Sequence, residues 1–408
     1  MVDTSLKNNA DLDSESSGYE SYSLRWSRKK INPLKGDVPP DIGTVVLDSL
    51  KEWQRPLPAL VADLSDGAVV CNISNNKSFA HSKLLTHFGR VDVFGSHHFH
   101  AFLLENGDVG LHETDSVRVD SRMRYQVSNS PPARLPVPQI TCEEGEYYCS
   151  GSSINKDDVI RVDGDVFFGT PIEPDNWGMW LLNCLPSVDY MLRNQPNSKF
   201  MCWARSSWQF NLLKFMGLPE DKLVIHEPWR LYSCDNLSMH RYSRVDLIPT
   251  TTDHEVFDRI RDRYGADLLD GYSKIFISRK TFTSKGGYRG LVNEDELIDA
   301  LVKLGFKVVE PELLPFEEQI RVFASADVVI GLAGAGMFNA IFCKPGTSLI
   351  SIESTANFVL NHANLFASKG LRYGFIYGKQ DAEDTSKTQK RWHLDVQQAI
   401  RYIRDFIS

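Results

Sequence analysis

The chain has 408 residues, of which 42% are hydrophobic and 24% are charged, and its formal net charge is −8. This composition is typical of a globular protein with room for two domains and extensions. The acidic balance argues against general nucleic-acid binding, and no apolar stretch approaches the roughly 20 residues that span a bilayer.

The first residues lack the apolar core of a secretory signal, so we expect a cytoplasmic protein. The seven cysteines are scattered and odd in number, which favours reduced thiols. A Cys142–Cys149 bridge is the alternative, and it would imply export.

Residues 1–42 are rich in Ser, Asp, Asn and Lys, which predicts a mostly disordered tail. Within this tail three aromatic residues precede a basic run, namely Tyr19, Tyr22 and Trp26 before Arg28-Lys29-Lys30. Such a segment fits peripheral contact with the anionic inner surface of a membrane. It also fits a solvated tail that packs locally, and we favour this second interpretation.

Residues 43–150 predict a β-rich region that ends in a proline-rich linker. The apolar run at 100–104 is followed by Glu105-Asn106-Gly107-Asp108, which is typical of a hairpin turn. The cluster His97-His98-Phe99-His100 resembles a metal site. Alternation along a strand would place its imidazoles on opposite faces, so we expect no metal there.

From residue 151 strands alternate with helices, which predicts an α/β fold with parallel sheets and right-handed crossovers. In the last third, the strand at 274–278 ends directly in Arg279-Lys280. A second strand, at 326–330, leads into Gly331-Leu332-Ala333-Gly334-Ala335-Gly336 and then a helix. A glycine turn between strand and helix brings bare N–H groups up to an anion.

If these two strands share a parallel sheet, both turns open at its carboxyl edge, where open α/β sheets bind ligands. The pattern therefore predicts a site for a phosphate-bearing ligand, most simply a nucleotide. It lacks the Gly-x-Gly-x-x-Gly signature, which disfavours a nicotinamide cofactor.

Several signals mark helix ends in the same region. Asn293 and Glu296 have the spacing of a capping box, Gly305 suits the C′ position after that helix, and Pro315 opens the next. The last helix is predicted to dock through one apolar face, formed by Val396, Ile400, Ile403 and Ile407.

The stretch from Lys274 to Glu353 resembles glycosyltransferase family 61. The matching segments come in the expected order: 275–280, 292–297, 304–309, 316–319, 323–327, 334–336 and 345–347. A second match, Asn176-Trp177-Gly178 with the residues up to Pro186, looks like the family's helix in the first sugar-transferase lobe.

The resemblance implies a GT-B architecture, in which two Rossmann-like lobes face each other across a cleft. We expect the acceptor lobe at 151–252 and the nucleotide-sugar lobe at 253–385. The helix within 386–408 is expected to pack back on the first lobe.

The implied activity is inverting, metal-independent transfer of a sugar from a nucleotide-sugar donor, most simply a UDP-sugar, with no tightly bound cofactor. The implied acceptor is a cell-surface glycan or glycolipid precursor, as in polysaccharide or lipopolysaccharide biosynthesis. The sequence does not distinguish hexosyl from pentosyl transfer.

The predicted donor-binding residues are Ser278, Arg279, Lys280, Lys285, Gly334, Ala335, Gly336 and Glu353. A bidentate guanidinium at Arg279 can neutralise a departing diphosphate, and Glu353 can bind a ribose hydroxyl. One of Lys280, Lys285 and Arg289 is expected to clamp the donor. For each cation the alternative is a solvated charge, and for Glu353 it is a helix cap.

Asp175 is the candidate catalytic base that takes the acceptor's hydroxyl proton. The alternative for Asp175 is an N-cap carboxylate. Family 61 commonly carries histidines where this chain has Met179 and Ala333, and Asp where it has Asn183. A non-catalytic binding or scaffold protein of the same fold is therefore the rival hypothesis.

Overall fold

The computed structural model describes residues 28–33, 43–63, 79–95, 100–105, 107–111, 137–151, 154–242, 248–265, 267–284, 289–354, 360–385 and 390–408. The chain is a mixed α/β protein, as predicted, and its contacts divide it into two compact units. Unit 1 is Met1–Leu47, Lys83–Asp175 and Asn183–Val245. Unit 2 is Asp48–Ser82, Asn176–Leu182 and Asp246–Ser408. The predicted domain boundaries remain predictions.

Unit 1 is built on a long mixed sheet. Its strands are β1 (Lys29–Pro33), β2 (Gly43–Trp53), β4 (Phe79–Gly95), β5 (His100–Leu104), β6 (Val109–Leu111), β7 (Gln139–Glu143), β8 (Glu146–Ser150), β9 (Val159–Phe168), β10 (Lys199–Cys202), β11 (Leu223–Ile225) and β12 (Leu231–Tyr242). Its helices are η1 (Lys156–Asp158), α5 (Leu185–Asn194), α6 (Ser207–Phe215) and η3 (Glu220–Lys222). Parts of β2 and β4 belong to unit 2.

The sheet of unit 1 joins a parallel part to an antiparallel part. Strands β11, β10, β9 and β12 are parallel neighbours, which is the 3-2-1-4 order of a Rossmann half. Antiparallel β4 and β5 continue the sheet from β12, and β5 and β6 form the expected hairpin. The predicted β-rich character of the amino-terminal region is therefore confirmed.

Within residues 1–42, which the composition predicts to be mostly disordered, Lys29–Pro33 forms strand β1. This strand pairs with β6 and β8, and Ile31 is buried in the core beneath them. Arg28 and Lys30 form ion pairs with Glu143 and Glu146. These distant partners order the basic run. The aromatic residues Tyr19, Tyr22 and Trp26 lie outside the described residues.

Unit 2 is built on a second, largely parallel sheet. Its strands are β3 (Leu60–Ala62), β13 (Lys274–Ile277), β14 (Lys307–Val309), β15 (Val328–Leu332), β16 (Ser348–Ser354), β17 (Arg372–Gln380) and β18 (Trp392–His393). Its helices are α4 (Trp177–Met179), α7 (Thr251–Tyr264), α8 (Lys280–Ser284), α9 (Glu294–Val302), η4 (Pro311–Leu313), α10 (Phe316–Ser325), η5 (Ala335–Phe342), α11 (Leu360–Ser368) and α12 (Val396–Ile407). The π-helical turn η2 (Trp180–Cys184) joins α4 to α5.

The main strands of unit 2 follow the order β14-β13-β15-β16-β17, all parallel. In chain order this is 2-1-3-4-5, the flavodoxin-like arrangement, and its topological switch point lies between β13 and β15. Strand β3 adds in parallel beside β17, and β18 pairs with β17 in antiparallel.

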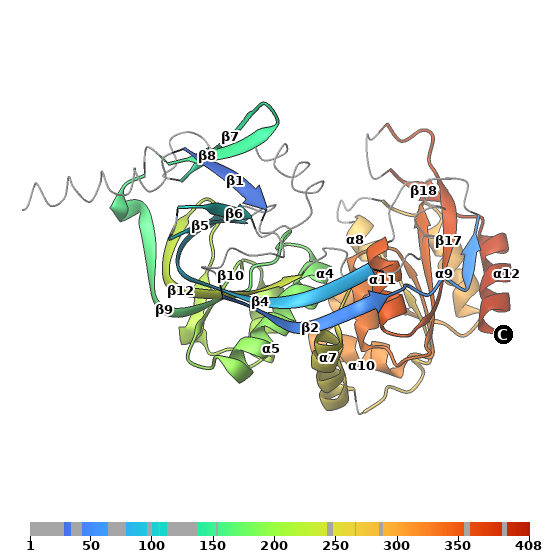
Figure 1. The fold of residues 1–408 in the computed structure, drawn as a ribbon. Coiled ribbons are helices and arrows are strands. Elements are labelled where there is room, and N and C mark those ends of the chain that lie inside the picture. The colour runs from blue at the N-terminus through green and yellow to red at the C-terminus, as the bar shows by residue number, and fades with distance from the viewer. Residues whose placement is uncertain are drawn as a thin grey trace, which may run out of the picture. The chain divides into compact units, whose positions relative to one another are not determined.

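Helices α9 and α12 lie beside the sheet of unit 2 (Figure 1). The apolar side chains of one sheet face form a core with these two helices. From α12 this core takes Val396, Ala399, Ile403 and Phe406. The apolar face of the final helix is therefore buried within unit 2, and the expectation that this helix packs back on the first lobe stays a prediction. In the part of the chain that the structure describes, no helix is long and apolar enough to cross a bilayer.

Two of the predicted helix-end signals behave differently. Gly305 has φ +82° and follows α9, as its C′ position requires. The Asn293–Glu296 capping box is wrong, since the Asn293 side chain makes no cap hydrogen bond. The Asn293 amide instead donates to the carbonyl of Leu394 at 2.9 Å and accepts from its N–H at 3.1 Å. It thereby ties the start of α9 to the segment before α12.

Candidate functional site

The two predicted turns open side by side at one edge of the unit 2 sheet. Strands β13 and β15 are parallel neighbours, and Ile277 lies opposite Gly331 in their register. Because both strands run the same way, Arg279 and the glycine turn follow at the same carboxyl edge. This edge is the switch point of the sheet, where open α/β folds bind ligands.

The Arg279 side chain lies directly against the glycine turn. Its Nη1 donates to the carbonyl oxygen of Ala333 at 2.8 Å, and its guanidinium carbon lies 4.9 Å from the centre of the exposed Phe282 ring. A Cβ built on Gly334 would come within 3.1 Å of the Arg279 Nε. The structure therefore brings Arg279, Ala333 and Gly334 together.

Gly334 is needed here for space, since its φ of 172° is extended backbone that any residue adopts. Helix η5, a 3₁₀ helix where a regular helix was expected, begins at the next residue. Ala335 is exposed and Gly336 is half-buried. In the described part of the chain, the N–H groups of these two residues have no hydrogen-bond partner. They are donors available to an anion.

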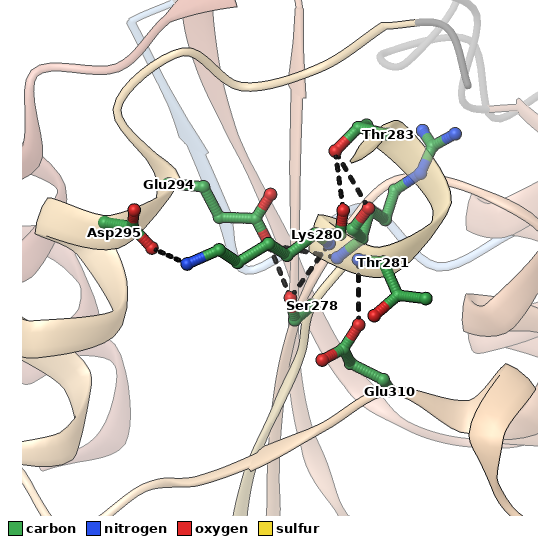
Figure 2. Close-up of polar contacts among 8 residues, drawn as sticks. Ser278, Lys280, Thr281, Thr283, Glu294, Asp295 and Glu310 are labelled. Atoms are coloured by element: carbon green, nitrogen blue, oxygen red, sulfur yellow. Dashed lines mark hydrogen bonds and ion pairs between the residues drawn. The ribbon is translucent and has the colours of Figure 1, made fainter. Parts of the chain in front are cut away.

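Glu294, at the start of α9, fixes the turn after β13 (Figure 2). Its Oε1 accepts from the Ser278 hydroxyl at 2.6 Å and from the Arg279 N–H at 3.0 Å. The Ser278 Oγ in turn accepts from the N–H of Lys280 at 3.1 Å. Burial raises the pKa of Glu294, although these hydrogen bonds oppose the rise. Ser278, which was predicted to bind the donor, thus forms hydrogen bonds that hold the turn in shape.

The neighbouring residues of α8 are held by two further acids. Lys280 reaches away along α9 to Asp295, with Nζ 2.5 Å from Oδ1, and both side chains are exposed (Figure 2). The N–H of Thr281 donates to Glu310 at 2.8 Å. Sequence reasoning did not single out Glu294 or Glu310, because acids near a helix start usually serve only the helix dipole.

Glu353 lies at the end of β16, on the same carboxyl edge. It is only 2% exposed and accepts from the N–H of Ser354 at 2.9 Å. Tyr377 stands opposite it in the register of β17, and burial together with the charge of Glu353 raises the pKa of that phenol. Lys285 lies outside the described residues, so its predicted role in donor binding stays a prediction.

Two further groups come to this edge: His362, which the donor prediction did not include, and Arg289, which was one of the three candidate clamps. The Nε2 of His362, on α11, lies 3.1 Å from the carbonyl oxygen of Gly334. Arg289 has φ +60°, which is strained for a residue with a side chain. The Trp392 indole holds this backbone by donating to the Arg289 carbonyl at 2.9 Å. No local sequence pattern marks His362, since its position depends on how distant segments pack.

Asp175 belongs to unit 1 and the donor-binding residues to unit 2. Its Oδ2 accepts from Nη2 of Arg205 at 3.1 Å, and both side chains are partly exposed. The N-cap of α4 is Asn176, whose Oδ1 accepts from the N–H groups of Gly178 and Met179. The capping alternative for Asp175 is therefore wrong, and its role as a base remains a prediction.

The Asn-Trp-Gly motif packs against η5 within unit 2. The Trp177 indole donates to Asn339 at 2.9 Å, and the Asn339 amide donates to Gln319 at 2.8 Å. A Cβ at Gly178 would lie 2.3 Å from the Phe338 ring. These contacts support the segment that carries the glycine turn, so the motif has a packing role.

Among the residues that the structure describes, no group of His, Cys, Asp and Glu could hold a metal ion. His97 and His98 of the histidine cluster lie outside those residues, and His100 is buried among aromatic rings. Cys142 and Cys149 are free thiols, so the bridge between them is not formed.

Comparison with known proteins agrees with this geometry. Residues 177–350 match the model of the family Glycosyltransferase 61. Over 139 residues the chain is 28% identical to a Beta-1,2-xylosyltransferase of Arabidopsis thaliana, covering 29% of this chain and 26% of that protein. Over 72 residues it is 36% identical to the Xylan glycosyltransferase MUCI21 of Arabidopsis thaliana, covering 17% of this chain and 15% of that protein.

The matches thus span about a quarter or less of each relative's length. The matched family region includes β13, Arg279 and the glycine turn, the same elements that build the edge described above. Through residues 177–350, this chain is similar to glycosyltransferase family 61.

Proposed function

We propose that this chain transfers a sugar from a nucleotide-sugar donor to a glycan acceptor, and that the carboxyl edge of the unit 2 sheet holds the donor's diphosphate. The observation that carries this proposal is the Arg279 guanidinium beside the glycine turn, 2.8 Å from Ala333 O. Free N–H groups at Ala335 and Gly336 add uncharged donors to the same place. Diphosphate recognition needs this combination of a planar cation and backbone amides.

The chemistry at this edge would be stabilisation of the leaving group. As the bond from sugar to diphosphate breaks, negative charge grows on the diphosphate oxygens. A fixed guanidinium and fixed N–H groups stabilise that charge without having to reorganise. We therefore keep metal-independent transfer as part of the proposal, together with a UDP-sugar as the donor.

The finer features of the reaction are part of the same proposal. They are a GT-B arrangement of two lobes, inversion at the anomeric carbon, and Asp175 as the base. The name of the Beta-1,2-xylosyltransferase favours a pentosyl donor such as UDP-xylose, and that of the Xylan glycosyltransferase MUCI21 favours a xylan-type acceptor. The acceptor proposed from the sequence is a glycan or glycolipid precursor, and the cytoplasmic, membrane-peripheral location remains a proposal too.

A specific observation favours the rival, a non-catalytic relative. Family 61 commonly has histidines at two positions where this chain has Met179 and Ala333, and Ala333 is buried in the turn. A protein that kept the donor edge and lost its acid–base groups would bind nucleotides without turning them over. Binding and turnover must therefore be measured separately.

Titration calorimetry with UDP, GDP and CMP tests the donor site. We expect one of these nucleotides to bind, and Arg279→Ala to weaken its binding by at least about tenfold, the loss expected for a charged hydrogen-bonding group. Arg401→Ala, which removes an exposed cation on α12, is the matched control and should bind like wild type. Failure of all three nucleotides to bind would refute the proposal.

Turnover is measured next, as release of UDP from UDP-xylose and UDP-glucose with and without xylan-type acceptors. Transfer or donor hydrolysis that Asp175→Asn abolishes would support the enzyme and its base. Nucleotide binding with no turnover of any donor would instead favour the non-catalytic rival.

A further inference from the structure

His362 is a buried histidine that the proposed reaction has not used so far. It lies on α11 with its Nε2 3.1 Å from the carbonyl oxygen of Gly334. Its ring is 4.7 Å from the Phe338 ring and stacks on Phe366 at 5.7 Å with an interplanar angle of 12°. Two aromatic neighbours and one hydrogen bond thus fix the position of the imidazole.

The partner atom defines the protonation state of this ring. A carbonyl oxygen only accepts hydrogen bonds, so the Nε2 of His362 must carry the proton. Burial, together with the positive charges of Arg289 and Arg279, lowers the pKa of His362 to about 4. At neutral pH the residue is therefore an uncharged imidazole that donates from Nε2.

The hydrogen bond controls the direction of a backbone donor. In a planar trans peptide the carbonyl and the next N–H point in opposite directions. Holding the Gly334 oxygen on His362 therefore turns the Ala335 N–H away from α11. That N–H has no partner among the described residues, and Ala335 is exposed.

The preceding peptide is held in the same way. Arg279 binds the Ala333 oxygen at 2.8 Å, so two successive carbonyls are fixed by side chains from different elements, α11 and the turn after β13. The Gly334 oxygen also accepts from the Met337 N–H at 3.1 Å within η5, so His362 adds a second donor, from a side chain, to the carbonyl that the helix already binds.

We infer that His362 is a positioning residue of the diphosphate site: its Nε2–H holds the Gly334 carbonyl and so aims the Ala335 N–H at the donor's phosphates. This inference rests on the proposed function, because it assumes that a diphosphate occupies the turn. His362 itself does not touch the ligand.

Three variants separate the hydrogen bond from the packing. His362→Phe keeps an aromatic ring between Phe338 and Phe366 and removes the N–H. His362→Gln keeps an uncharged N–H donor at a similar reach and removes the ring. Phe366→Leu keeps the imidazole and removes its stacking partner. Thermal unfolding of each full-length variant checks that it is folded.

The dissociation constants for inorganic pyrophosphate, UDP and uridine are then measured by calorimetry. For pyrophosphate and UDP we expect His362→Phe to bind about tenfold more weakly, the effect of one lost hydrogen bond. His362→Gln and Phe366→Leu should stay within about threefold of wild type, which is below that effect. Uridine, which has no phosphate, should bind all four proteins alike.

If His362→Phe binds UDP and pyrophosphate as tightly as the wild type does, the inference is overturned. An equal loss in His362→Gln or in Phe366→Leu would also overturn it, since the ring packing would then be the cause. If the wild-type chain binds neither pyrophosphate nor any nucleoside diphosphate, the proposed function is refuted and the inference falls with it.

Discussion

The Arg279 guanidinium donates to the carbonyl oxygen of Ala333 at 2.8 Å, although the two residues are 54 positions apart in the chain. The contact exists because β13 and β15 are neighbouring parallel strands that end at one edge. It leaves the adjacent N–H groups of the turn exposed to an incoming anion. The proposed diphosphate site depends on that junction.

Gly334→Ala should weaken nucleoside diphosphate binding without unfolding the protein. The backbone angle at this position suits any residue, but the new Cβ would lie 3.1 Å from Arg279 Nε and displace the guanidinium. We expect about tenfold weaker binding by calorimetry, the scale of one misplaced hydrogen bond. Gly43→Ala, at a glycine whose Cβ would meet nothing closer than 3.8 Å, is the control. Unchanged affinity in Gly334→Ala would contradict the proposed placement of Arg279.

Glu294→Ala should destabilise unit 2 and Glu294→Gln should largely preserve it. One oxygen of Glu294 accepts from both Ser278 and Arg279, and a glutamine oxygen can do the same. Removing the acceptor takes this hydrogen bond from the buried Ser278 hydroxyl and from the part-buried Arg279 N–H, at about 1–3 kcal/mol each. Urea unfolding measures the difference, and equal loss in both variants would show that the charge matters instead.

The free energy of unfolding should fall as the pH drops from about 7 to 5. Burial lowers the pKa of His226 to about 3 and those of His254 and His362 to about 4, and it places that of His240 well below 6.5. The unfolded chain binds protons below about pH 6.5 that the folded chain excludes, so stability is lost on acidification. Each fully buried imidazole lowers the free energy of unfolding at pH 5 by up to about 2 kcal/mol.

Urea unfolding at pH 7.5 and at pH 5 checks this sign. His226→Gln should reduce the difference between the two pH values. A chain that is equally stable at both, or more stable at pH 5, would contradict the neutral state of these imidazoles.

Ile403→Ala should reduce stability by about 2–5 kcal/mol, as large-to-small changes in a core do. Ile403 is fully buried between α12, α9 and the sheet of unit 2. Arg401→Ala, on the exposed side of the same helix, is the control and should change stability by less than about 0.5 kcal/mol. Equal behaviour of the two variants in thermal unfolding would mean that α12 does not dock as described.

Local patterns predicted much of unit 2, because its strands and helices alternate regularly. The glycine turn was also predictable, because glycines between a strand and a helix leave backbone N–H groups bare. Arg279 and Gly334 could be placed at one edge from strand order alone. The helix end at Gly305 was also predictable, since it depends on a single residue's backbone freedom.

What the sequence did not predict depends on distant partners. Lys29–Pro33 is a strand because β6 and β8 pair with it, and the Asn293 amide binds the distant Leu394 as well as the Glu296 side chain of its own helix. His362 reaches Gly334 only because α11 packs on η5. No window of neighbouring residues contains these relationships.

A crystal structure of the full chain with bound UDP tests the proposed diphosphate site most directly. We expect the diphosphate within hydrogen-bonding distance of the N–H groups of Ala335 and Gly336 and of the Arg279 guanidinium. A nucleotide bound elsewhere, with the edge formed by Arg279 and Gly334 empty, would contradict the proposed site.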